Sequence, residues 1–232
     1  LGPVRGDEGH PHGFMIREIG RMGTDPFAAD PVSPGGADGR MQDKSAMEHT
    51  PRNGTWNALR ILVTGPPGCG KTTVVRKVAE ILGDKAAGFY TEEIRDANRQ
   101  RTGFRVVTLD GKRGELADKS SGHGPRVGSY RVNVESFARV ALPSLEMRGG
   151  KVLVIDEIGK MECHAEPFVR RVREIFRSGS PVLATIPLRG GGEWIEEIRR
   201  QGDVTTFLVT PENREALPAQ LAAMLSGILG QS

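Results

Sequence analysis

Short apolar runs alternate with segments of helical periodicity from residue 59 to the end of the chain. The runs Leu59–Val63, Val152–Ile155, Val182–Ile186 and Val204–Val209 are rich in β-branched residues and leucine. Such runs predict strands, and the uninterrupted run Val152–Ile155 is typical of a central parallel strand that is buried on both faces. Apolar residues spaced three and four apart between the runs predict amphipathic helices. The predicted helix after the first run has its apolar face at Val74, Val75, Val78, Ile81 and Leu82.

The pattern departs from plain strand–helix alternation after this first helix. Two β-rich runs, 88–95 and 102–109, flank a short polar link and predict a hairpin, and Asp110-Gly111 predicts a second tight turn. Farther along, Asn133 is a typical helix N-cap, and Thr210-Pro211 predicts the first turn of the last helix. We therefore predict an α/β fold in which a mainly parallel sheet is flanked by helices and carries an inserted β-hairpin.

Composition divides the chain into two unequal parts. Residues 1–57 contain 16 Gly or Pro residues but only seven Leu, Ile, Val or Phe, which is too few to build a core. We predict a disordered low-complexity tail over 1–57 and one folded domain over 58–232, which is long enough for a well-buried core.

The segment Gly65-Pro66-Pro67-Gly68-Cys69-Gly70-Lys71-Thr72 matches the phosphate-loop pattern G-x-x-x-x-G-K-[ST]. It lies between a predicted strand and a predicted helix, which is the context that this motif requires. Glycines let backbone N–H groups point at a polyphosphate, and the start of the helix adds the positive end of its dipole. Lys71 is placed to reach the β- and γ-phosphates, the Thr72 hydroxyl to bind Mg²⁺, and Thr73 to contact the nucleotide. The motif predicts binding of a nucleoside triphosphate.

Two carboxylates, Asp156 and Glu157, directly follow the apolar run Val152–Ile155. At the carboxyl end of a central parallel strand, Asp156 would face the crevice where ligands bind in open α/β sheets. It could hold Mg²⁺ through water, because this ion gives up its hydration shell reluctantly. Glu157 is then the group that we expect to orient and deprotonate an attacking water.

Charge and cysteine content exclude several other classes of protein. The net charge of +3 is spread along the chain, so we predict no nucleic-acid binding. No apolar stretch has the length of a signal peptide or a membrane span, so we predict no membrane association. The two cysteines, Cys69 and Cys163, form no C-x-x-C pair, which fits a protein of the reducing cytoplasm. We expect a monomer.

With these residues assembled, the chain resembles the cancer-related, THEP-type nucleoside-triphosphatase family of P-loop proteins. The resemblance covers nearly all of residues 58–230. Its most specific strings are Gly88-Phe89-Tyr90-Thr91-Glu92-Glu93 and Asp156-Glu157-Ile158-Gly159-Lys160-Met161-Glu162. It implies a RecA-like core, slow hydrolysis of several nucleoside triphosphates, and two nucleotide-contacting segments, Gly65–Thr72 and the strand end through Ile158 and Gly159. The glycine run Gly190–Gly192 departs from the family pattern.

Three functions share this phosphate loop. Hydrolysis is favoured by the Asp156-Glu157 pair, because a carboxylate poised beside the γ-phosphate would waste nucleotide in a kinase. A nucleotide or nucleoside kinase would need arginines in a lid, which Arg113, Arg126 and Arg131 could supply. A slow nucleotide-dependent switch is the third alternative.

A charge-stabilising arginine cannot be singled out from the sequence. The candidates Arg95, Arg131 and Arg214 each fit an exposed structural position equally well. Glu92 and Glu93 fit both a supporting role at Mg²⁺ and an exposed hairpin edge.

Overall fold

The structure is a computed structural model that describes residues 60–230. The predicted tail, 1–57, lies outside the described residues, as do both ends of the predicted domain. The strands are β1 (Arg60–Thr64), β2 (Ala86–Arg95), β3 (Arg101–Thr108), β4 (Arg113–Asp118), β5 (Arg126–Val127), β6 (Tyr130–Val132), β7 (Val152–Ile155), β8 (Val182–Thr185) and β9 (Val204–Leu208). The α-helices are α1 (Lys71–Leu82), α2 (Val134–Ser144), α3 (Glu166–Arg177), α4 (Glu193–Arg199) and α5 (Leu217–Leu229).

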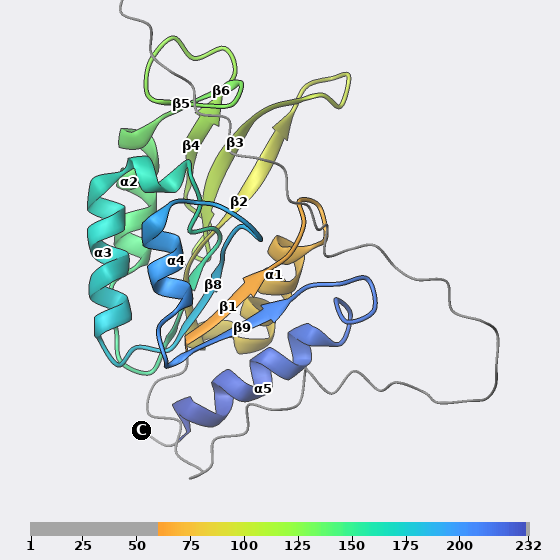
Figure 1. Ribbon diagram of the computed structural model, residues 1–232, viewed down its shortest axis with the longest axis vertical. Helices are drawn as coiled ribbons and strands as arrows, with labels where there is room; N and C mark the ends of the chain where they lie inside the picture. The colour runs from red at the N-terminus through yellow and green to blue at the C-terminus, as the bar shows by residue number, and fades with distance from the viewer. Residues whose placement is uncertain (1–59, 231–232) are drawn as a thin grey trace, which may run out of the picture. The chain divides into compact units, whose positions relative to one another are not determined.

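All of the strands described between residues 60 and 230 belong to one sheet, in the order β5-β6-β4-β3-β2-β7-β8-β1-β9. The five strands from β2 to β9 in this order pair in parallel. From β2 outward to β5 every pairing is antiparallel. The predicted α/β fold with a sheet flanked by helices is thus confirmed. The sheet is mixed, because the predicted hairpin β2–β3 is the beginning of a longer antiparallel extension (Figure 1).

Two hydrophobic clusters cover the two faces of the sheet. One face packs against α2, α3 and α4, and its centre is formed by Phe89, Phe137 and Phe168, whose ring centroids lie 5.2–6.0 Å apart. The other face packs against α1 and α5. Every residue of β1, β7 and β8 is buried, as the apolar runs predict for central strands.

Two local predictions are wrong. The last helix begins at Leu217 and not at Thr210-Pro211. The Asn213 side chain accepts a hydrogen bond from the Thr210 N–H and donates one to the Leu208 carbonyl, and these bonds favour a series of turns before the helix.

The second wrong prediction concerns Ile81, which was predicted on the apolar face of α1 but is 58% exposed. It follows Glu80 at the edge of the buried stripe, where solvent reaches the helix.

No helix among the residues that the structure describes is long and apolar enough to cross a membrane.

Gly88 allows a close approach between the neighbouring strands β2 and β7. It has a φ of +123° and pairs with Val154, and a Cβ atom at this position would lie 2.0 Å from the Val154 carbonyl oxygen. We expect Gly88→Ala to lower the free energy of unfolding by more than about 3 kcal/mol, because β2 and β7 must separate to admit the methyl group. Urea denaturation measures this loss.

Gly111→Ala is the matched control, because Gly111 also has a positive φ, +90°, but no atom within 4 Å of a built Cβ. It should cost about 1–2 kcal/mol, the price of the backbone conformation alone. Equal losses in the two variants would contradict the close approach of β2 to β7.

Candidate active site

The phosphate-loop motif connects β1 to α1, as predicted. Gly68 and Gly70 have φ values of +76° and +108°, which bend the loop around the first turn of α1. The Lys71 Nζ lies over this loop and donates hydrogen bonds to the carbonyl oxygens of Gly65 and Pro66, at 3.1 and 3.4 Å. Because the first N–H groups of a helix have no partner within it, the start of α1 offers donors and a positive dipole end to an anion.

Asp156 lies at the carboxyl end of β7 and is 1% exposed. The Thr185 hydroxyl donates to its Oδ1 at 2.6 Å, and the backbone N–H of Thr91 donates to its Oδ2 at 3.4 Å. Burial raises the pKa of Asp156, whereas hydrogen bonds from Thr185, Thr72 and Thr91 and the charge of Lys71 lower it. The Thr72 hydroxyl at the start of α1 is therefore near the carboxylate that follows β7.

Strand β8 brings the two predicted segments together, because it pairs with both β1 and β7. Beyond the strand, the N–H of Ile186 donates to the Val63 carbonyl at 3.0 Å, and the N–H of Ile158 donates to the Thr185 carbonyl at 2.8 Å. These bonds fix the phosphate loop on one side of β8 and the Asp156-Glu157 segment on the other.

A cavity of about 1100 Å³ opens at this end of the sheet. The predicted site residues that line it are Gly65, Pro66, Pro67, Gly68, Gly70, Lys71, Thr72, Thr73 and Glu157. Four predicted residues do not line it: Cys69, Asp156, Ile158 and Gly159. Asp156 is buried at the base of the phosphate loop, and the Ile158 side chain is fully buried in the core.

The opposite wall of the cavity comes from the antiparallel extension. Glu92 lies between two arginines there, with Arg105 Nε 2.8 Å and Arg76 Nη1 3.7 Å from its carboxylate oxygens. Both arginines line the cavity, as do Glu93 and Arg189. Arg76, Arg105 and Arg189 were not among the predicted site residues. The available signal was that Arg76 lies one helical turn after Thr72, and that Arg189 follows a buried strand.

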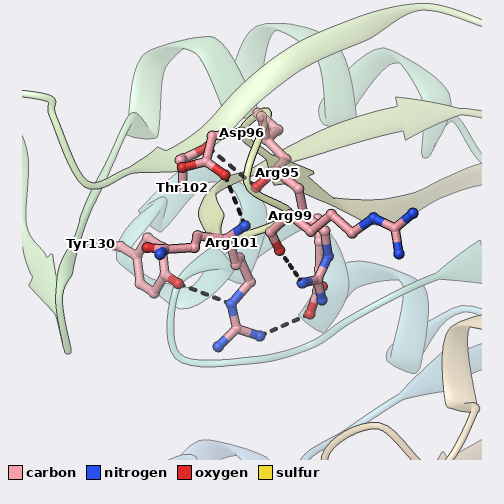
Figure 2. A network of polar contacts seen from close by, with 9 residues as sticks. Arg95, Asp96, Arg99, Arg101, Thr102 and Tyr130 are labelled. Carbon is pink, nitrogen blue, oxygen red and sulfur yellow. Dashed lines mark hydrogen bonds and ion pairs between the residues drawn. The ribbon is translucent and has the colours of Figure 1, made fainter.

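None of the predicted charge-stabilising arginines, Arg95, Arg131 and Arg214, lines this cavity. Arg95 and Arg101 belong to a polar network at the tip of the β2–β3 hairpin (Figure 2). In this network Arg95 donates to the Arg99 carbonyl at 2.8 Å, and Arg101 donates to the Tyr130 hydroxyl at 2.9 Å. These contacts stabilise the hairpin tip and leave Arg95 with a structural role.

Two further carboxyl groups lie beside Asp156. Burial, and then the charge of Asp156, raise the pKa of Glu157, and the charge of Lys71 lowers it. Glu162, which is 5% exposed, has its pKa raised to about 8 by burial and by the charge of Glu157. Gly159 separates these two side chains, since a Cβ on Gly159 would lie 2.6 Å from Glu157 Oε1 and 2.9 Å from Glu162 Oε2.

The donor set fits Mg²⁺ bound together with a polyphosphate. No group of three or more His, Cys, Asp or Glu residues in the described part of the chain could hold a metal ion alone. Mg²⁺ in nucleotide sites needs no such group, because phosphates and water supply most of its oxygen ligands. Thr72 and Asp156 supply one hydroxyl and one carboxylate for such an ion, and the Thr72 hydroxyl lies close enough to lower the pKa of Asp156.

A phosphate loop after β1, an acidic pair after β7 and the strand β8 between them define a P-loop NTPase with a RecA-like core. Residues 60–222 match the protein family described as NTPase, and the chain belongs to this family.

Two similar proteins have names that fit this family. The chain is 42% identical to nucleoside-triphosphatase THEP1 of Aquifex aeolicus, over 72% of this chain and 99% of the relative. It is 44% identical to the human cancer-related nucleoside-triphosphatase, over 69% of this chain and 93% of the relative.

Two solved structures have the same fold. The crystal structure of THEP1 from Aquifex aeolicus superposes with a TM-score of 0.67 at 41% identity, covering 72% of this chain and 99% of that one. The solution structure of a human cancer-related nucleoside triphosphatase gives a TM-score of 0.63 at 41% identity, covering 73% of this chain and 98% of that one.

The raised pKa of Glu162 predicts a pH-dependent stability. The folded protein holds this proton up to about pH 8, whereas the unfolded chain releases it near the ordinary value of 4.5. The contribution of Glu162 to the free energy of unfolding therefore falls as the pH rises from about 4.5 to about 8. Glu162→Gln should remove this pH dependence. As the pH rises from about 5 to about 8, the free energy of unfolding of the variant should therefore increase by a few kcal/mol relative to that of the parent.

Urea denaturation of parent and variant at the two pH values measures the difference. Glu115→Gln, a substitution at an exposed carboxyl of β4, is the control and should change stability equally at both. A Glu162→Gln effect that does not vary with pH would show that Glu162 is ionised in the folded protein.

Proposed function

We propose that this chain hydrolyses nucleoside triphosphates to diphosphates and phosphate with the help of Mg²⁺. One observation carries the proposal: Lys71, Thr72 and Glu157 face a single cavity, and Asp156 is hydrogen-bonded directly beneath it. The names of the relatives, which are nucleoside-triphosphatases, support the same reaction.

Each residue has a separate task in this reaction. The N–H groups at the start of α1 and the ammonium of Lys71 hold the β- and γ-phosphates and stabilise the negative charge that develops on them. Bound Mg²⁺, held by Thr72 and Asp156, would supply further positive charge at the phosphate oxygens. Glu157 accepts the proton of the attacking water, and its raised pKa makes it a stronger base than an exposed carboxylate.

The kinase alternative has less support. It needed lid arginines from segment 111–131, but only Leu116 and Val127 of this segment line the cavity. The three arginines of that segment are absent from the lining residues described between positions 60 and 230. A slow nucleotide-dependent switch would bind the nucleotide in the same way and would differ from the proposed hydrolase only in its rate of turnover. The monomeric state, the cytoplasmic location and the lack of nucleic-acid binding stay predictions.

Substitutions should separate the tasks of Lys71 and Glu157. Lys71→Ala removes a charge that contacts phosphate before and during the reaction, so nucleotide affinity and kcat should both fall. Glu157→Gln preserves shape but cannot accept a proton, so kcat should fall about 100-fold while the nucleotide Kd stays near that of the parent. Nucleotide titration and steady-state phosphate release measure the two quantities.

Glu80→Gln is the control for the removal of a carboxylate, because Glu80 lies on the exposed side of α1. It should leave both quantities unchanged. If Glu157→Gln hydrolyses at the parent rate, Glu157 is not the base, and the kinase and switch alternatives gain support.

Hydrolysis should extend to ATP, GTP, CTP and UTP. The groups that we assign to the nucleotide, namely the phosphate loop, Thr72, Asp156 and Glu157, recognise phosphate and metal, which all four substrates share. A preference above about 100-fold for one base would need roughly 3 kcal/mol of base-specific contacts. Measuring kcat/KM for the four nucleotides tests this expectation, and one strongly favoured base would refute it.

A further inference from the structure

The segment between β8 and α4, residues 186–192, lies next to both halves of the site. Because β8 pairs with β1 and β7, its carboxyl end emerges between the phosphate loop and the Asp156-Glu157 segment. Pro187, Leu188 and Arg189 of this segment line the same cavity as Lys71 and Glu157. The segment thus lies between the phosphate loop and Glu157, the residues to which we assign the phosphates and the attacking water.

The beginning of this segment is fixed in place. The Thr64 hydroxyl donates to the Ile186 carbonyl at 3.2 Å, and Arg199 of α4 donates to the Pro187 carbonyl at 2.9 Å. Arg189 follows two residues later and is exposed. The residues after it, Gly190–Gly192, have φ values of +72°, +106° and +96°. Arg189 therefore lies between an anchored backbone and a run of glycines that can change conformation with little steric cost.

The other arginines of the cavity are engaged with a carboxylate. Arg76 and Arg105 both pair with Glu92, and Arg76 also lies 4.5 Å from the Tyr90 ring centroid. Among residues 60–230, Arg189 is the arginine of this cavity for which the structure shows no ion pair. Its guanidinium carries five donors in a planar fork that matches phosphoryl oxygens.

We propose that Arg189 is a catalytic arginine supplied by the chain itself, which donates to the γ-phosphoryl oxygens as the bond to the leaving diphosphate breaks. The inference rests on the proposed hydrolysis at this site. Charge moves toward the leaving oxygen and the transferred group in this step, so a cation that arrives with the transition state accelerates it. Water still supplies the attacking oxygen, and Glu157 still receives its proton.

The variants Arg189→Ala and Arg189→Lys test the proposal in the full chain. Arg200→Ala is the matched control, because Arg200 is an exposed arginine at the end of α4 that does not line this cavity. The measured quantities are kcat and KM for MgATP, the Kd of MgADP, and the Kd of MgADP with aluminium fluoride, which imitates the transferred phosphoryl group. Thermal midpoints show whether each variant is folded.

We expect Arg189→Ala to lower kcat about 1000-fold, the lower end of the range for such arginines, with the Kd of MgADP within about threefold of the parent. The variant should lose the tight complex with aluminium fluoride, because that complex resembles the transition state. Arg189→Lys should recover only part of kcat, since an ammonium lacks the fork. Millimolar guanidinium should raise kcat of Arg189→Ala and leave Arg200→Ala unchanged.

Three results would overturn the assignment. A kcat of Arg189→Ala within about threefold of the parent would show that Arg189 has no part in the step. An equal loss of MgADP affinity and kcat would make it a ground-state binding residue. A lowered thermal midpoint with no response to guanidinium would make it structural. A parent chain without hydrolysis would instead refute the proposed function, so the two failures are distinguishable.

Discussion

The rest of the site depends on a buried carboxylate at the end of the central strand. Removing an ionised carboxylate from water costs several kcal/mol unless hydrogen bonds and opposite charge compensate. Asp156 receives this compensation from Thr185 of β8, from the Thr91 backbone of β2, and from Thr72 and Lys71 at the start of α1. One side chain thereby connects three neighbouring strands to the phosphate loop.

The position of β8 explains why the site has two unlike walls. Because this strand lies between β1 and β7, the phosphate loop and Glu157 approach the same cavity from the two sides of β8. The parallel core supplies the floor, with donors and acids directed along the strand ends. The antiparallel extension, β2 to β5, continues the same sheet past these ends and supplies the facing wall, where Glu92 holds Arg105 and Arg76 in place. A sheet that changes from parallel to antiparallel at β2 thus forms both sides of one cavity.

The sequence predicts the features that depend on neighbours along the chain. The phosphate loop, the strand before Asp156 and the hairpin of β2 and β3 are local patterns, and the structure has them where they were expected. The start of α5 was missed because the Asn213 side chain stabilises turns where Pro211 alone suggests a helix. Arg189 was missed because only strand order places it beside Lys71, and strand order is a property of the whole fold. Glu162 gave no local signal either, since its pKa depends on burial next to Glu157.

Three acidic groups with raised pKa values lie close to Lys71 in the site. Burial raises the pKa of Asp156, Glu157 and Glu162, and the charge of Lys71 opposes the shift at the first two. A protein selected for stability alone would replace such a cluster by apolar residues, as buried charges are seldom a net gain. The cluster suits a site whose ligand brings positive charge of its own, because a divalent cation favours the ionised form of every carboxyl near it. A nucleotide that carries Mg²⁺ meets this condition, and a bare polyphosphate, which adds only negative charge beside the acids, does not. The electrostatics of the folded chain therefore fit the proposed metal–nucleotide complex better than a bare polyphosphate.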